Sequence, residues 1–133
     1  MPTETALATL QQRVDAIESG YEFMLAYAAQ GLATDEGSAN SEQLRMYLQR
    51  MDEGIAGLEE ALRTVLGEAG APAFEDFLKV LSGDAAASRA ALRVVTSRPG
   101  ISSQLVDNLN ASIHLRALLT DLFLLDEAVK GLK

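Results

Sequence analysis

Two stretches of the chain carry apolar residues at alternating steps of three and four, with no missed position. Such spacing places the apolar side chains on one stripe of an α-helix that packs at a shallow angle against its neighbours. The first seam is Leu7, Leu10, Val14, Ile17, Tyr21, Met24 and Ala28, and the second is Leu44, Leu48, Met51, Ile55, Leu58, Leu62, Val65 and Ala69. The pattern predicts a bundle of long helices.

Start and stop signals around these seams predict four helices, over residues 4–30, 41–68, 72–97 and 102–130. Thr3 is placed to cap the first helix. Pro72 is well placed at the first position of the third. Three short connections imply that successive helices run antiparallel. We therefore expect one all-α domain over residues 1–133, an antiparallel up-down-up-down four-helix bundle.

Glycines mark three weak points in the predicted helices. Gly83 marks the point at which the third helix is open to a kink or a restart. Gly54 and Gly57 interrupt the second helix at a cost of about 1 kcal/mol each relative to alanine. We interpret these two glycines as the place where another helix comes close. The alanine-rich segment 85–91 of the third helix is the candidate neighbour.

The helix predicted over 102–130 is more apolar than a monomeric bundle requires. One seam would face the core, formed by Leu115, Leu118, Leu122, Leu125, Val129 and Leu132. Further apolar residues lie beside it, and so broad a stripe is typical of an interaction surface. We expect an interface that contains Leu115, Leu119, Phe123 and Leu124, most simply in a two-fold homodimer. The alternative is that Phe23, Tyr27 or Tyr47 of the same chain cover the excess.

Composition narrows the classes of partner. The net charge is −8, without a basic stripe, which argues against nucleic-acid binding and against docking to an anionic membrane. The apolar-rich stretch from Leu115 to Val129 contains Arg116, Asp121, Asp126 and Glu127, so we expect no membrane span. With no cysteine and no targeting segment, the expected location is cytoplasmic.

His114 is the one histidine of the chain and the first candidate for chemistry. Its segment resembles the phospho-accepting helix of histidine kinases and phosphotransfer bundles, because an arginine, Arg116, closely follows a helical histidine. The resemblance covers a handful of residues and implies a phosphotransfer-like protein or an enzyme centred on His114. Leu115 stands where the kinases have an acidic residue, and the glycine and lysine of the phosphotransfer domains are missing.

Metal and cofactor signatures are missing from the sequence. A di-metal bundle site typically needs two Glu-x-x-His pairs, but position 111, three residues before His114, is alanine. There is also no glycine-rich phosphate loop and no nucleophile elbow. We predict no metal site and no cofactor, and assign no catalytic residue.

Three aromatic residues supply the remaining candidate site. Tyr27 and Tyr47 flank the predicted connection between the first two helices, near Phe23. Together they could line an apolar pocket at one end of the bundle.

The sequence thus favours a non-enzymatic interaction module, a small acidic adaptor, assembly factor or regulator that acts through the last helix. The alternatives are a binder of a small apolar ligand at Phe23, Tyr27 and Tyr47, and the phosphotransfer-like protein or enzyme centred on His114.

Overall fold

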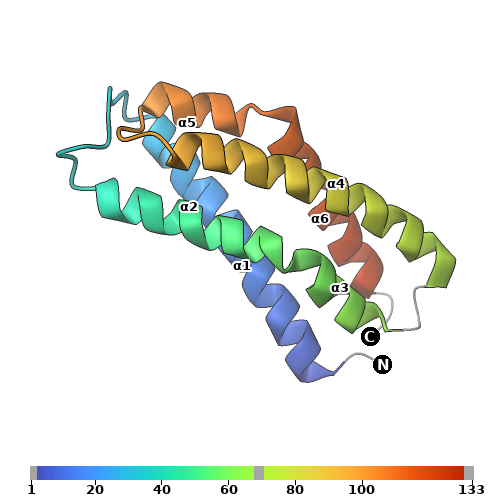
Figure 1. Ribbon diagram of the computed structural model, residues 1–133. Helices are drawn as coiled ribbons and strands as arrows, with labels where there is room; N and C mark the ends of the chain where they lie inside the picture. Colours follow the sequence, from blue (N-terminus) through green and yellow to red (C-terminus); the bar gives the residue numbers. More distant parts are fainter. Residues whose placement is uncertain (1–2, 68–70, 131–133) are drawn as a thin grey trace.

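The computed structural model describes residues 3–67 and 71–130, and every regular element in these ranges is a helix. The all-α prediction is confirmed, but two of the four expected helices are each interrupted. The chain forms α1 (Glu4–Ala28), α2 (Ser41–Ala56), α3 (Leu58–Leu66), α4 (Ala71–Thr96), α5 (Ser103–Asn110) and α6 (Ile113–Lys130) (Figure 1). Residues 68–70, at the predicted end of the second helix, and Leu132, at the end of the last seam, lie outside the described residues.

Gly57 separates α2 from α3, with φ −102° and ψ 7°. The guanidinium of Arg13, from α1, occupies the space that a Cβ on residue 57 would need. Arg13 Nη1 donates a hydrogen bond of 2.9 Å to the carbonyl oxygen of Glu53. In an unbroken helix that oxygen would accept from the N–H of residue 57. Arg13 therefore replaces the helical hydrogen bond that the break removes.

The second helix does approach a neighbour closely at a glycine, as predicted, but the neighbour is α1. A Cβ on Gly54 would lie 3.1 Å from the carbonyl oxygen of Arg13 and 3.4 Å from Ile17 Cγ1. From the other side, a Cβ on Gly20 of α1 would lie 3.0 Å from Met51 Cβ. The expectation that the alanine-rich part of the third helix faces these glycines is wrong.

Ala111 and Ser112 separate α5 from α6. The hydroxyl of Ser112 accepts a hydrogen bond of 3.3 Å from the backbone N–H of His114, in the first turn of α6. From α4, the buried Ser88 hydroxyl donates to the carbonyl oxygen of His114 at 3.0 Å. α5 packs against α1, whereas α6 packs against α4. The break therefore carries the chain from the side of α1 to the side of α4.

α4 is continuous through Gly83, so the structure shows no restart at the weak point predicted there. It packs against α2 and α6, while α1 packs against α2, α3 and α5 (Figure 1). Every helix contributes apolar side chains to one core, among them Ile17, Met24, Leu48, Leu62, Leu81, Leu92, Val106, Leu115 and Leu118.

Candidate functional site: the groove between α1 and α6

An open hollow of about 440 Å³ lies between α1 and α6. α1 supplies Glu18, Tyr21, Glu22 and Leu25, and α6 supplies Arg116, Leu119, Thr120 and Phe123. Leu119 is 8% exposed, whereas Phe123 is 64% exposed and Leu25 is 48% exposed. The lining thus combines apolar side chains, two of them exposed, with charged ones.

A second hollow, of about 270 Å³, lies further along the same two helices. It is lined by Leu7, Ala8, Leu10, Gln11 and Val14 of α1 and by Asp126 and Val129 of α6. We call the two hollows together the α1–α6 groove. The two hollows are separate, and together they span α1 from Leu7 to Leu25, about 27 Å at 1.5 Å per residue.

Only part of the α1 seam is fully buried in the core. Ile17 and Met24 are fully buried. The four seam residues that line the groove are only partly buried, namely Leu7, Leu10, Val14 and Tyr21. Because α6 packs mainly against α4, it covers this part of the seam only in part.

The residues predicted for an interface divide between core and surface. Leu115 is fully buried in the core, so it is not part of the accessible surface. Leu119 lies in the groove and Phe123 lines it, while Leu124 is 56% exposed and lines none of the described hollows. The alternative that Phe23, Tyr27 or Tyr47 cover this face is wrong, because Phe123 and Leu124 stay exposed.

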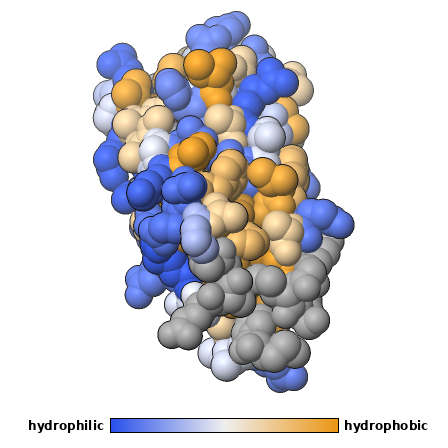
Figure 2. Space-filling model, turned by 90° about the vertical axis from the view of Figure 1, so that its right-hand side faces the viewer, coloured by the Kyte–Doolittle hydropathy of each residue, from blue (hydrophilic) through white to orange (hydrophobic). Residues whose placement is uncertain are grey.

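Hydrophobic side chains reach the surface on α4 as well as on α6. The exposed large apolar residues of these two helices are Val80, Val94, Ile113, Phe123 and Leu124. Figure 2 shows hydrophobic surface gathered in the middle of the face that looks to the right in Figure 1, with hydrophilic surface along one side. Of these two helices, α6 places an exposed apolar residue, Phe123, in one of the described hollows, and α4 does not.

Carboxylates dominate the charge around the groove. Glu18 and Glu22 line one hollow and Asp126 lines the other. Burial raises the pKa of Glu18, and the nearby charges of Asp15, Asp126 and Glu22 raise it further. Among the described residues that line either hollow, Arg116 is the single basic one, and it has no salt bridge within the described part of the chain. The groove therefore has a negative potential.

The three aromatic residues predicted to bind a ligand lie near the connections at one end of the molecule. The rings of Phe23 and Tyr47 stack with centroids 4.6 Å apart. Tyr27 is fully buried and its hydroxyl donates to the carbonyl oxygen of Ile101 at 2.6 Å. None of the described hollows is lined by these three side chains, so a ligand site there stays a prediction.

Asp35 is the residue at this end that sequence reasoning missed. Its buried carboxylate accepts from Arg45 Nε at 2.9 Å, from the Ser41 hydroxyl at 2.7 Å and from the Ile101 N–H at 2.7 Å. Arg45 also donates to the carbonyl oxygens of Arg98 and Pro99, at 3.2 and 3.0 Å. Asp35 thus joins the 29–40 connection to the 97–102 connection. The one sequence signal was the spacing of Ser41 and Arg45, one turn apart on α2.

Donors determine the ionisation of Asp35. Burial alone would raise its pKa, but the hydrogen bonds from Arg45, from the Ile101 backbone and from Ser41 outweigh burial and lower the pKa to about 2. The carboxylate is therefore charged at neutral pH and has a structural role.

A second buried carboxyl, Asp121 of α6, lies against Asp84 of α4. Burial raises the pKa of Asp121 to about 7, with a hydrogen bond and charge repulsion from Asp84 acting in the same direction. Its Oδ2 atom is buried and has no hydrogen-bond partner in the described residues. The pair retains a proton at pH values where an ordinary aspartate has lost it.

His114 is exposed in the first turn of α6. Its backbone is held by Ser88 and Ser112, and the imidazole is accessible to solvent. In residues 3–67 and 71–130, no three acidic, histidine or cysteine side chains gather as a possible metal site. A chemical role for His114 stays a prediction.

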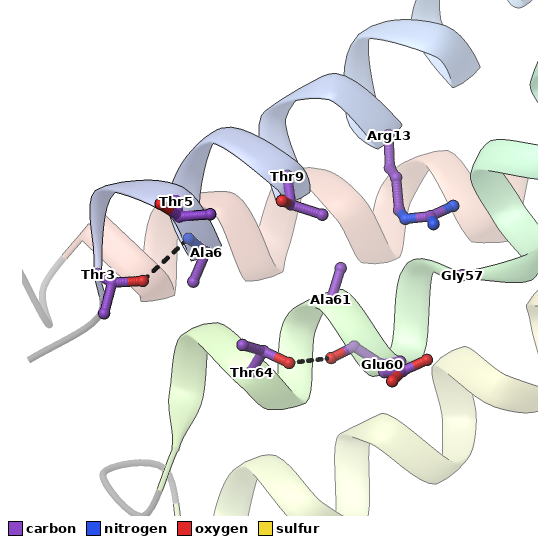
Figure 3. A pocket seen from close by; sticks show the side chains of 9 residues that line it. All are labelled: Thr3, Thr5, Ala6, Thr9, Arg13, Gly57, Glu60, Ala61 and Thr64. Atoms are coloured by element: carbon purple, nitrogen blue, oxygen red, sulfur yellow. Dashed lines mark hydrogen bonds between the residues drawn. The ribbon is translucent and has the colours of Figure 1, made fainter.

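A polar hollow of about 370 Å³ lies between the start of α1 and α3. Figure 3 shows the threonines of α1 on one side, Glu60, Ala61 and Thr64 of α3 on the other, and Arg13 extended towards Gly57. The Thr3 hydroxyl accepts from the Ala6 N–H, and Thr64 donates to the Glu60 carbonyl oxygen. Thr3, Thr64 and Arg13 are therefore already used by the fold.

Comparison of the chain with protein-family models, curated proteins and solved structures finds no match. Among the described helices, none is both long and apolar enough to cross a membrane.

Proposed function

We propose that this protein is a non-enzymatic interaction module that holds a helix of another protein in the α1–α6 groove. The observation that carries the proposal is Phe123, 64% exposed at the edge of an apolar hollow. An amphipathic helix in an apolar groove is a recurring mode of recognition. The length of the groove, about 27 Å, corresponds to about 18 residues of such a helix.

A four-helix interpretation explains why the groove exists. We infer that α2 with α3, and α5 with α6, are two interrupted members of an antiparallel four-helix bundle. An unbroken last helix could lie along α1 over its whole length. Because the break at Ala111 and Ser112 moves α6 towards α4, the α1 seam is left partly uncovered.

A second copy of this chain is the competing occupant, as in the homodimer expected from the sequence. Burying a residue such as Phe123 contributes about 1.5–3 kcal/mol to an association. Sedimentation velocity at micromolar concentration tests this directly. A dimer that the Phe123→Gln change dissociates would assign the groove to a second copy and overturn the proposal.

The helix proposal is tested with a neutral 18-residue amphipathic peptide built from leucine and glutamine. We expect its addition to shift amide resonances of α1 and α6 in a ¹H–¹⁵N NMR titration. Phe123→Gln should weaken binding about tenfold, since it removes about 1.5 kcal/mol of apolar burial.

Val94→Gln is the matched control, because Val94 is 62% exposed on α4 and lines none of the described hollows. It should bind the peptide like the unchanged protein. Shifts confined to other helices, or equal affinities of the two variants, would overturn the proposed function.

A further inference from the structure

We infer that the helix held in the α1–α6 groove is cationic, with lysine or arginine side chains flanking its apolar stripe. This inference rests on the proposed function and adds the chemical class of the partner. Its first support is the charge on the α1 side of the groove, where Glu18 and Glu22 line the hollow that also contains Arg116. Asp15 adds a third carboxylate that acts on Glu18.

The α1 carboxylates form a row beside the apolar one. Asp15, Glu18 and Glu22 follow each other at steps of three and four, so they share one stripe of the helix, about 5 Å apart. We call them the acidic row. Positive residues at steps of three and four on a docked helix would match this spacing. The apolar residues of that helix would meet Tyr21, Leu25, Leu119 and Phe123.

The acidic row also acts electrostatically as a group. The pKa of Glu18 is raised by burial and then by its acidic neighbours, so these carboxylates repel one another when the groove is empty. A cationic helix would relieve this repulsion, which is an interaction that a neutral helix cannot make.

Charge also decides against a second copy as the occupant. Each copy has a net charge of −8, and a two-fold pairing would bring the acidic rows of both copies to one interface. Arg116 is the single basic residue that the described lining of each copy offers in return. Like charges brought together in this way disfavour association.

The probes are two fluorescein-labelled 18-residue peptides with the same leucine stripe, one flanked by lysine and the other by glutamate. We expect the lysine peptide to bind at least tenfold more tightly in fluorescence anisotropy at 50 mM salt. Raising the salt to 500 mM should reduce this difference severalfold, because the exposed charges are then screened.

The decisive variant is Glu18→Lys/Glu22→Lys, which reverses two of the three charges of the acidic row. It should weaken the lysine peptide about tenfold and favour the glutamate peptide. The control is Glu42→Lys/Asp76→Lys, which changes the net charge equally at two exposed positions outside the described hollows. The control should change the affinity less than twofold.

The outcomes separate this inference from the proposed function. Equal weakening by both double variants would mean that net charge alone attracts the peptide, which overturns the inference. Equal binding of the lysine and glutamate peptides, still dependent on Phe123, would overturn the inference and leave the proposed function intact. If Phe123→Gln left the affinity of every peptide unchanged, both the inference and the proposed function would be overturned.

Discussion

Asp35 and Asp121 are two buried carboxyl groups of one protein with opposite acid–base behaviour. Three kinds of donor surround Asp35 and lower its pKa to about 2, although burial alone would raise it. Asp121 is also buried but lies against Asp84, and its pKa is about 7. Burial disfavours the charged form in both cases, so the partners determine which way the pKa moves. The same side chain therefore stabilises the fold at one site and limits its stability at the other.

The two sites also differ in what they connect. Asp35 holds the two connections at one end of the molecule through Arg45 and Ile101. Asp121 lies between α4 and α6, and α6 is the helix that borders the groove. Proton binding at Asp121 is therefore linked to the stability of the helix that carries Phe123.

The largest expected effect comes from Arg45→Ala. This change leaves Asp35 as a buried charge without its cation, which costs about 3–5 kcal/mol in comparable cases. The stability of the Arg45→Lys variant should lie between those of the unchanged protein and the Arg45→Ala variant, because lysine keeps the charge but not the planar set of donors. Urea denaturation at pH 7 measures both. Arg93→Ala, at an exposed position on α4, is the control and should change stability by less than about 0.5 kcal/mol. Equal stabilities for the Arg45→Ala and Arg93→Ala variants would contradict the role of Asp35.

The second-largest expected effect is an increase in stability. Asp121→Asn should increase the free energy of unfolding at pH 8 by about 1–3 kcal/mol, because it removes a buried charge that the fold does not stabilise. In the unchanged protein, Asp121 is protonated in the folded state up to pH about 7, but only to pH ~4 in the unfolded chain. The stability that it contributes is thus fully present below pH ~4 and is lost as the pH rises towards 7.

The contribution of Asp35 to stability depends on pH in the opposite direction. Its folded-state pKa is about 2, so its contribution is present above pH ~4 and is lost as the pH falls. Urea denaturation between pH 4 and pH 8 should show a slope that Asp121→Asn flattens. Asp107→Asn, at an exposed position on α5, should leave that slope as it is. An unchanged slope in the Asp121→Asn variant would contradict the raised pKa.

The apolar seams predicted the helices well but could not reveal their breaks. Thr3 caps α1 as expected, with its hydroxyl accepting from the Ala6 N–H at 3.0 Å. At Gly57 the seam continues across the break, since Ile55 and Leu58 on either side are both buried. Periodicity reports which side of a helix faces the core, but it does not report whether each backbone hydrogen bond is made.

The candidate site was predicted from one of its two helices. The surplus of apolar residues on α6 indicated Phe123, which is exposed. The regular seam of α1 gave no sign that Leu10 and Val14 would be only partly buried, because that depends on where α6 packs. Asp35 could not be predicted for a similar reason, since Ile101 lies 66 residues away in the sequence.

The smallest expected effect comes from Asp84→Asn, which tests whether the neighbour or burial dominates at Asp121. Burial is the largest cause of the raised pKa, and the hydrogen bond and charge of Asp84 come after it. The change should therefore lower the pKa of Asp121 without returning it to the ordinary value of about 4. It should raise the stability at pH 8 by about 0.5–1 kcal/mol, less than Asp121→Asn does, because burial continues to disfavour the charged form. A carboxyl ¹³C NMR titration of Asp121 measures the shift directly. An ordinary pKa in this variant would show that the carboxylate pair, and not burial, distinguishes Asp121 from Asp35.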